Sequence, residues 1–558
     1  MGLDPERITP AHELRDGLDY VPTHRAVLFG HHFASIAGLG PIVGPAIAVV
    51  WGWLPAVIWI IVGSIFIGGV HDIGCLFTSL RKKGRSVGDI IQDLVGRRAR
   101  ILFLLFIFFA MSLAMGVFAL LVSKLFSPLP PSAKASAISV PEAVLPSFAM
   151  LGIAIIIGVL VYKYKVKLLP VSIVGFVSTL FFVWLGTHYP ITSILGFELN
   201  PARWSYILLG YAFIASVLPV WLLLQPRDYI NSFQLYFGMA LLYLGLAIWH
   251  PPIAAPAVNV ALKVADNPSL GYAPIFPLLF ITVACGAVSG FHSLVASGTT
   301  SKQMDTEIDA RLVGYGAMIT EGALGVISVL ACVVGLGALA QWQKHYPDMK
   351  FAAGNALSNY VAGASEIISK TGIIDVNLAK GLIATVAVGF ALTTLDSATR
   401  LLRYNVEEIG KSINLPLLGN RFVAALIAIS GIAFFAFLRV PHPKTGQPTE
   451  VAWVLWSLFG ASNQLLAAFG LLTVTLFLQR LSKPTIYTAI PMILMFAVSI
   501  VALVMNLLQF WTQRNWILVV VGGAILVLAF WLAAESLMVF GRCWVEKWRG
   551  ETRFQTGR

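Results

Sequence analysis

The feature that most constrains this chain is a succession of apolar segments, each about as long as a membrane is thick. About fourteen such segments follow one another, and about 20 apolar residues in a helix cross the hydrocarbon core of a bilayer. Only helices and closed barrels satisfy their own backbone groups in lipid, and these segments are too long for barrel strands. The sequence therefore predicts an all-α polytopic membrane protein. We expect the spans at 26–50, 54–80, 101–126, 144–162, 169–187, 205–224, 233–250, 274–298, 313–340, 378–402, 421–440, 453–478, 485–510 and 516–540.

Composition excludes the main soluble classes of protein. Hydrophobic residues make up 58% of the chain and charged residues only 11%, whereas a soluble protein has about 25% charged residues. A cytosolic enzyme, a disordered protein and a secreted disulfide scaffold are thereby excluded. The net charge of +12 is typical of basic loops that face anionic lipid, so we expect contact with membrane lipid and none with nucleic acid. The 4 cysteines are far apart and predict buried thiols without a disulfide framework.

The distribution of basic residues predicts the orientation in the membrane. With the N-terminus inside, most of the 38 Lys and Arg residues fall in cytoplasmic segments. We therefore expect a cytoplasmic N-terminal segment at 1–25, a transmembrane transporter domain at 26–540 and a cytoplasmic tail at 541–558. The longest outside segment, 341–377, is predicted to be an extracellular loop that carries a cap.

Two of the predicted spans contain residues that interrupt a helix near mid-membrane. Proline removes a backbone donor, and each glycine costs a helix about 1 kcal/mol. The first span and the eighth are seven apart and must run in opposite directions, which is typical of a secondary transporter built from inverted repeats. Opened turns expose N–H groups that attract a carboxylate and carbonyl groups that hold a cation. The residues that carry these interruptions are Gly38, Gly40, Gly44, Gly286, Ser289 and Gly290.

The expected repeats are about 26–250 and about 274–540. Glycine and proline also serve close packing between membrane helices, and this remains an alternative for each break. A seven-plus-seven repeat is the rival to a five-plus-five repeat with added helices. Both place the broken helices antiparallel.

Ionisable side chains inside spans are costly and are functional candidates by default. Asp396 lies in a stretch of hydroxyl residues with Thr394 and Ser397, whose oxygen atoms suit Na⁺ or a titrating proton site. The alternative for Asp396 is an ion pair with Arg400, four residues later on the same helix. Glu321 and Asp72 are candidates for coupling or for a proton relay.

Histidines and other polar residues complete the set of intramembrane candidates. His32 and His292 each belong to a broken span and are candidates for substrate binding, with ordinary packing as the alternative. Asn463 and Gln464 predict interhelical hydrogen bonds. Arg227 and Asp228 predict an interfacial anchor at the cytoplasmic end of the sixth span, with a gate as the alternative.

Several motifs are absent from the sequence. There is no phosphate-binding loop for an ATP-driven pump, no HExxH metal motif and no potassium-channel filter. We therefore expect no cofactor, no metal and no enzyme activity. A membrane-embedded metal-dependent enzyme and a passive channel remain the alternatives to a transporter.

Five separated stretches resemble the signature segments of the carbon starvation protein A (CstA) family. The resemblance runs from about residue 3 to about residue 480. Members usually carry a further apolar span before the segment that begins here at Gly2-Leu3-Asp4-Pro5, so we do not carry over the family's N-terminal topology. The five stretches are 30–45, 225–231, 289–303, 393–400 and 458–466.

The resemblance implies a prokaryotic inner-membrane transporter that imports nutrients when carbon is short. Members have been described as taking up peptides, and some as importing pyruvate with protons. The family is grouped with the amino acid–polyamine–organocation superfamily, which includes the LeuT-type fold. In that fold the first broken helix and a helix of the second repeat flank a cation site, and this implies a cation site at Thr394, Asp396 and Ser397.

Together these observations predict a symporter for a small carboxylate-bearing solute. The solute would bind where the two broken helices open, with donors from His32 and His292. The sequence leaves the choice between a peptide and pyruvate open, as well as the choice between proton and sodium coupling. It does not indicate an oligomeric state.

Overall fold

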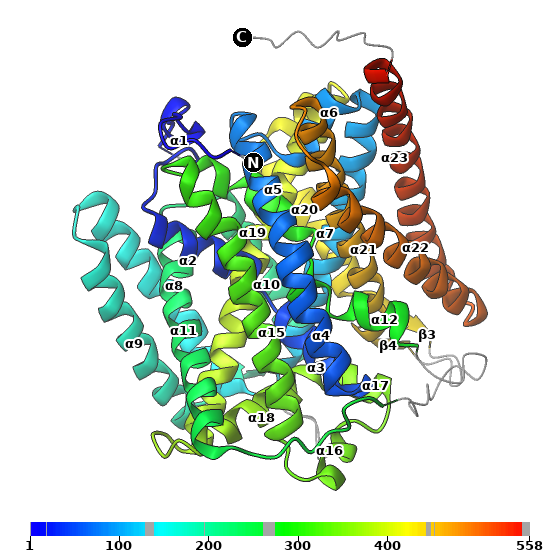
Figure 1. The fold of residues 1–558 in the computed structure, drawn as a ribbon. Helices are drawn as coiled ribbons and strands as arrows, with labels where there is room; N and C mark the ends of the chain where they lie inside the picture. The colour runs from blue at the N-terminus through cyan, green and yellow to red at the C-terminus, as the bar shows by residue number, and fades with distance from the viewer. Residues whose placement is uncertain are drawn as a thin grey trace.

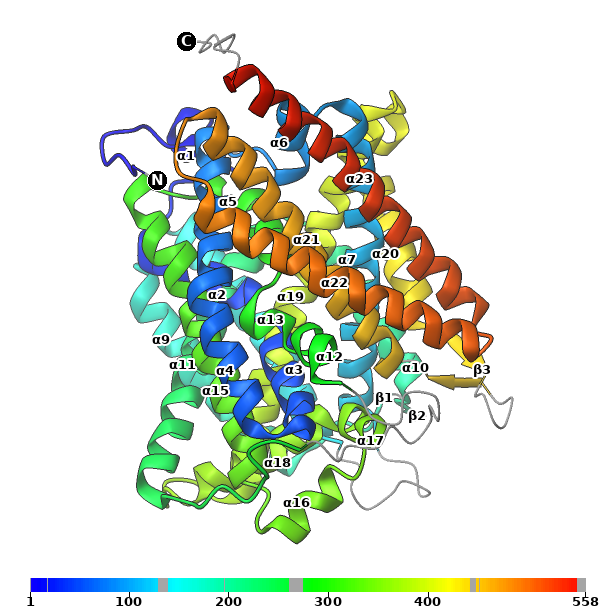
Figure 2. The ribbon, with the colours of Figure 1, turned by 45° about the vertical axis from the view of Figure 1, so that its right-hand side comes forward.

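The computed structural model is a bundle of helices that run roughly parallel to one another (Figure 1). It describes residues 2–17, 19–128, 139–194, 196–259, 274–441, 448–450 and 452–548, so most of the expected tail 541–558 lies outside the described residues. The N-terminus and α1 (Pro10–Glu13) lie at one end of the bundle, and α16 (Leu339–His345) lies at the other (Figure 1). Both views place α9 (Leu168–His188) at one edge and α23 (Trp516–Trp548) at the opposite edge (Figures 1 and 2).

Ten helices in the described part of the chain are long and apolar enough to cross a membrane, or eleven if the bent first pair counts as one span. Most expected spans coincide with these helices to within a few residues. The chain is therefore a multi-pass membrane protein. The ten helices are Trp53–Arg81, Arg97–Phe126 (α7), Pro141–Lys163, Leu168–His188, Leu224–Trp249 (α11), Glu307–Val334, Val376–Ser412 (α19), Leu455–Arg480, Ile486–Thr512 (α22) and Trp516–Ser536.

Besides the bent first span, three further expected spans are shorter or interrupted in the structure, and a count of fourteen stays a prediction. The span expected at 205–224 is α10 (Pro201–Val217), and the one expected at 421–440 is α20 (Arg421–Ala436). The span expected at 274–298 is divided into three pieces. The helix expected at 233–250 begins earlier, at Leu224, because the polar residues at its start are buried rather than interfacial.

The segment expected as a loop at 341–377 is largely helical. It contains α16, α17 (Met349–Gly354) and α18 (Ala356–Ser369), and one face of α18 is buried against α19. The Tyr346 hydroxyl donates to the Ala46 carbonyl oxygen at 3.0 Å and joins this segment to the first broken helix. Two short antiparallel hairpins pair β1 (Ser193–Ile194) with β2 (Phe197–Glu198) and β3 (Arg439–Pro441) with β4 (Pro448–Glu450).

The first predicted break is present. Helix α2 (Arg25–Ile36) ends before Gly38, and α3 (Gly40–Ala48) continues through the 3₁₀ turn η1 (Val49–Trp51) at an angle of 46°. Pro41 follows the first residue of α3, a position where its missing N–H has no intrahelical acceptor in any case. The glycine-proline sequence therefore ends one helix and starts the next.

The second predicted break is also present. Helix α12 (Ile275–Thr282) is followed by the single turn α13 (Ala284–Ala287) and then by α14 (Phe291–Gly298). Val288 between them is extended, with φ −155° and ψ 110°. The chain thus loses its helical winding for the residues just before Phe291.

The two broken helices pack against each other in opposite directions. A Cβ atom on Gly40 would lie 2.2 Å from the Cβ of Cys285, and a Cβ on Gly44 would lie 2.4 Å from the Thr282 carbonyl oxygen. Contacts that advance along α3 therefore run backwards along the second broken helix. This confirms the antiparallel arrangement of the interrupted spans, while the internal repeat itself stays a prediction.

Gly290 gives a test of how closely the second break is packed. A Cβ atom there would lie 2.4 Å from the Asn463 carbonyl oxygen and from the Ala467 nitrogen, which are backbone atoms that cannot move aside. We expect Gly290→Ala to destabilise the protein by about 1–3 kcal/mol, the usual cost of overpacking, and to lower its unfolding temperature in detergent. Gly286→Ala is the matched control, since its Cβ would meet nothing closer than 3.6 Å. Equal unfolding temperatures for the two variants would contradict this packing.

Candidate functional site

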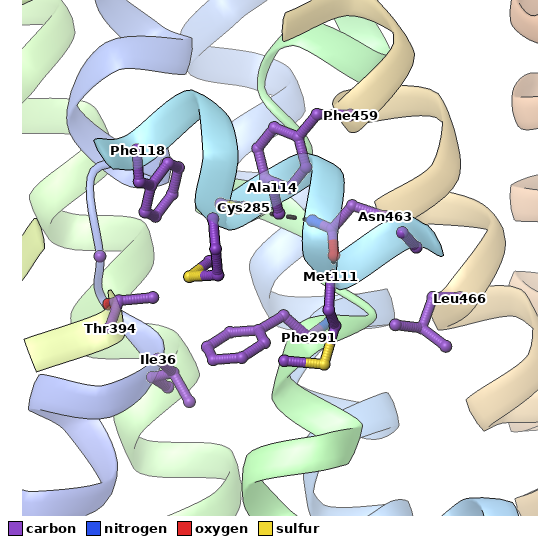
Figure 3. Close-up of a pocket in the computed structure, with 14 residues that line it drawn as sticks. Ile36, Met111, Ala114, Phe118, Cys285, Phe291, Thr394, Phe459, Asn463 and Leu466 are labelled. Atoms are coloured by element: carbon purple, nitrogen blue, oxygen red, sulfur yellow. Dashed lines mark hydrogen bonds between the residues drawn. The ribbon is translucent and has the colours of Figure 1, made fainter. Parts of the chain in front are cut away.

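A narrow cavity, with free space for little more than a water-sized group, lies where the two breaks meet (Figure 3). Helix α7 closes one side of the cavity, and α19 and α21 (Ala452–Arg480) complete its wall. A hollow between the interrupted helices is therefore present, although its lining is mainly apolar and not polar as we expected from two opened helices. Its lining residues are Ile36, Gly38, Gly40, Ala110, Met111, Ala114, Met115, Phe118, Cys285, Phe291, Thr394, Phe459, Asn463 and Leu466.

The cavity is mainly apolar, with polar groups at two places. In Figure 3 the rings of Phe118, Phe291 and Phe459 surround it, with Thr394 on one side and Asn463 on the other. No Asp, Glu, Lys, Arg or His side chain is among its lining residues. The lining therefore favours a small solute with an apolar part and only a few polar atoms, and the cavity has to widen to admit one.

Asn463 caps the second half of the broken helix. Its Oδ1 accepts a hydrogen bond from the Phe291 N–H at 3.0 Å, and its backbone carbonyl accepts from the Gly290 N–H at 3.1 Å. The side chain also hydrogen bonds to Ser289 and donates to the Cys285 sulfur. These contacts confirm the expected interhelical bonding, and they place at the cavity a residue that we had not predicted as a site residue.

The predicted glycines have different surroundings. Gly38 and Gly40 line the cavity, and a Cβ atom on Gly38 would lie 2.5 Å from the Thr394 hydroxyl. Gly44 and Gly290 approach backbone atoms of neighbouring segments, and Gly286 faces Pro41 at ordinary contact distance. Close packing therefore accounts for Gly44 and Gly290, whereas Gly38 and Gly40 also face the hollow.

Five side chains, of which all but the half-buried Tyr211 are buried, form a first charged group, which we call the Arg227 cluster. Arg227 pairs with Asp396 and, at 2.9 Å, with Asp228, while the Tyr211 hydroxyl contacts both Arg227 and Asp396. His31 Nδ1 lies 2.8 Å from Asp228. Arg227, Asp228 and Asp396 are fully buried, so each charge depends on the others for its stabilisation.

Two sequence-based interpretations are wrong at this cluster. Arg227 and Asp228 are not an interfacial anchor, because both side chains have no exposed surface. Asp396 pairs with Arg227 from another helix, and Arg400 donates instead to the carbonyl oxygens of Ala215 and Leu218. The sequence shows which charges lie in the span, but not which helices face one another.

Asp396 lies apart from the hydroxyl residues next to it in sequence. Thr394 donates to the Ser35 carbonyl oxygen at 3.3 Å, and the hydroxyls of Ser35 and Ser397 are 3.3 Å apart. These oxygen atoms lie beside the end of α2, at the first break. The structure thus brings Thr394 and Ser397 to the break, whereas the Asp396 carboxylate contacts Arg227.

Four other side chains form a second buried group, which we call the His292 cluster. Asp72 contacts His71 through Oδ1 at 2.7 Å and His292 through Oδ2 at 2.8 Å. His292 Nε2 lies 3.2 Å from Glu321 Oε2. All four side chains are fully buried, so the structure brings the predicted Asp72, Glu321 and His292 together and adds His71.

His32 lies between the two clusters and outside the cavity. Its Nδ1 is 2.8 Å from the Thr300 hydroxyl, just after α14. Neither His32 nor His292 lines the cavity, although Phe291, the neighbour of His292, does. The two predicted histidines therefore do not meet, and each contacts a different segment.

Larger hollows lie on both sides of the cavity. One lies toward the N-terminal end of the bundle and shares Met111 with the cavity. Its charged lining includes Arg85, Lys302 and Glu408. The other lies toward the opposite end and reaches Val43, one turn beyond Gly40. The cavity thus lies between two wider spaces that open in opposite directions.

A comparison with solved structures shows the same fold in a membrane transporter. A manganese transporter of Eremococcus coleocola aligns with a TM-score of 0.50, over 95% of this chain and 99% of that chain, at 11% identity. An identity this low is informative about the fold alone. The bundle, the buried cavity and the curated relatives below define a multi-pass membrane transporter.

The chain belongs to the carbon starvation protein CstA family, whose model matches residues 1–353 and 337–502. Among its relatives is a protein of Helicobacter pylori named peptide transporter CstA, 32% identical over 89% of this chain and 77% of that protein. Another is the pyruvate/proton symporter BtsT of Escherichia coli, 32% identical over 87% of this chain and 74% of that protein. The resemblance inferred from the sequence motifs is thereby confirmed.

The Arg227 cluster predicts a strong dependence of stability on Asp396. Asp396→Ala leaves a buried guanidinium with one carboxylate fewer, and breaking such a pair costs about 3–5 kcal/mol. We expect a marked fall in unfolding temperature, measured on purified protein in detergent. The control is Glu13→Ala, which removes the exposed ion pair with Lys83 and should cost less than about 1 kcal/mol. A variant at Asp396 as stable as the control would contradict the structural role of this pair.

Proposed function

We propose that this protein is a secondary active importer of a small carboxylate-bearing nutrient, a peptide or pyruvate. Transport is coupled to a proton or sodium gradient across a prokaryotic inner membrane, with both termini in the cytoplasm, and serves the cell when carbon is short. The observation that carries the proposal is the closed cavity at the meeting point of two broken helices, with a wider hollow on each side. The printed names of two relatives, a peptide transporter and a pyruvate/proton symporter, support the same class of solute.

The solute carboxylate is proposed to bind at the first turn of α3. Helix N-termini carry a partial positive charge, and Gly38 and Gly40 keep side chains out of that space. Pro41 has no N–H and the Ile42 and Val43 N–H groups donate to the Leu39 carbonyl oxygen, so the Gly40 N–H is the backbone donor that this turn of α3 offers to a carboxylate. Thr394 offers a hydroxyl donor on the same side of the cavity. The N-terminus of α14 is already capped by Asn463, so a carboxylate reaches it only by displacing that amide.

The apolar remainder of the solute is proposed to pack among the three phenylalanine rings and Met111. His32 and His292 stay outside this contact zone in the closed state, and a role for them in substrate binding requires movement of α2 or α14. Candidates for ion coupling are Asp396, the hydroxyls of Thr394 and Ser397, and the pair of Asp72 and Glu321. A channel and a membrane-embedded enzyme are the rival functions.

Reconstitution into proteoliposomes tests the proposed function directly. We expect labelled pyruvate or labelled dialanine to accumulate when an inward proton or sodium gradient is imposed, and the accumulation to collapse when that gradient is dissipated. Empty liposomes are the control. Flux that only equalises the two sides would indicate a channel, and chemical conversion of the solute would indicate an enzyme.

Cys285 tests whether the solute occupies the cavity. It lines the cavity, whereas Cys332 is fully buried elsewhere in the span Glu307–Val334. In single-cysteine proteins, we expect N-ethylmaleimide to label Cys285 and not Cys332, and the accumulated solute to slow this labelling several-fold. Labelling of Cys285 that is insensitive to a solute accumulated by the same protein would place the binding site elsewhere.

A further inference from the structure

The two buried clusters differ in the groups that neutralise the negative charge of their carboxylates. The Arg227 cluster contains a guanidinium, which stays charged in proteins and holds Asp396 and Asp228 in ion pairs. The His292 cluster has two carboxyl groups, on Asp72 and Glu321, and only imidazoles beside them. Its charge therefore depends on how many protons it holds, whereas the first cluster has a permanent cation.

Asp72 fixes the orientation of both histidines. Its two oxygen atoms each accept from one Nδ1, that of His71 at 2.7 Å and that of His292 at 2.8 Å. An ionised carboxylate can only accept hydrogen bonds, so the Nδ1 atom of His292 carries a proton that it donates to Asp72. The remaining nitrogen, Nε2, is then the one that gains or loses a proton.

The Nε2 atom of His292 faces Glu321. The two are 3.2 Å apart, and both Glu321 oxygens lack a hydrogen-bond partner within the described part of the chain. Before the proton binds, the pair is a neutral imidazole and a carboxylate. A proton on His292 Nε2 gives an imidazolium–carboxylate ion pair, and a proton on Glu321 gives an imidazole beside a carboxylic acid. In both cases one negative charge of the buried cluster is neutralised.

Within the described ranges of the chain, the neighbouring helices add no permanent charge to this pair. The titratable groups that face it are His32 on α2, His71, Asp72 and Cys75 on α5 (Gly69–Arg81), and Cys285 on α13. An unneutralised charge at the centre of a membrane costs about 2.5–3.5 kcal/mol on insertion scales. A proton is therefore the ion that this site can take up without a further ligand.

The pair is also joined to the wall of the cavity. His292 follows Phe291, whose ring lines the cavity and whose N–H is bound by Asn463. Movement of α14 in response to the proton would shift both the Phe291 ring and the hydrogen bond between the Phe291 N–H and Asn463. The cluster thus has a direct structural path to the solute.

We propose that the coupling proton of this transporter is bound between His292 and Glu321, that Asp72 and His71 are positioning residues, and that Asp396 is a fixed partner of Arg227. This rests on the proposed function and deepens it, because it selects the proton over sodium and one candidate group over the others. The proton binds to a lone pair of His292 Nε2 or of Glu321, and its departure restores that lone pair.

Infrared difference spectroscopy of the purified protein, acid minus alkaline, tests the site without any solute. We expect a difference signal from a carboxyl or an imidazolium group that is lost in Glu321→Gln and equally in His292→Asn, since both remove the same shared proton. Asp396→Asn, which keeps a hydrogen-bond acceptor for Arg227, should retain the signal. Size-exclusion chromatography selects the folded variants, and either substitution at the pair suffices for the test.

A substitution of His71 tests whether this residue positions the proton site or only supports the fold. His71→Asn leaves Glu321 and His292 in place, so we expect the signal to persist but to appear at a different pH. A signal unchanged in Glu321→Gln and His292→Asn, a signal lost only in Asp396→Asn, or no signal in the unmodified protein would overturn the proposal.

Transport measurements distinguish this inference from the proposed function. In proteoliposomes, Glu321→Gln should lose accumulation of labelled pyruvate driven by a proton gradient, while exchange of pyruvate across the membrane without a gradient persists. Normal proton-driven accumulation in this variant would also overturn the inference. If the unmodified protein accumulates neither pyruvate nor dialanine although the infrared signal behaves as expected, the proposed function fails and the proton site stands.

Discussion

The need to satisfy every backbone group inside a bilayer determines how this protein can hold a cavity. A helix interrupted in lipid leaves N–H and C=O groups without partners, each of which costs several kcal/mol. Both interruptions are therefore buried, and the second is completed by Asn463, which accepts from Phe291 and Gly290. The glycines at the breaks bring the segments close enough for such contacts. The breaks that form the cavity are stable because neighbouring helices supply hydrogen-bond partners for backbone groups that water would otherwise bind.

The same low-dielectric interior gives the two charged clusters different properties. In the Arg227 cluster the cation is permanent, and removing a carboxylate leaves a buried charge without full compensation. In the His292 cluster the balance is set by bound protons. The first arrangement favours a fixed contact between α11 and α19, and the second favours a contact that responds to its ionic surroundings. His31 joins the Arg227 cluster to α2, the first half of the first broken helix, whereas the adjacent His32 contacts Thr300.

The sequence predicted the elements of this fold that depend on local chemistry. The positions of most helices, both breaks and the set of buried ionisable residues follow from hydropathy, from glycine and proline, and from the cost of charge in lipid. The partner of Asp396 could not be predicted, since Arg227 lies 169 positions away on another helix. The capping role of Asn463 could not be predicted, because the sequence does not distinguish a polar residue that joins two helices from one that caps a helix. The helices within 341–377 were missed because their apolar faces are short.

Met111 lines both the central cavity and the hollow toward the N-terminal end. On that side a single unbranched thioether chain stands where the two spaces meet, and such a chain changes rotamer easily. On the other side, the hollow reaches only Val43, and Tyr346 holds α3 to the segment between α16 and α17. The two sides of the cavity therefore differ in stiffness. Connecting the cavity to the hollow near the N-terminal end requires a rotamer change of Met111, whereas connecting it to the opposite hollow requires α3 to tilt.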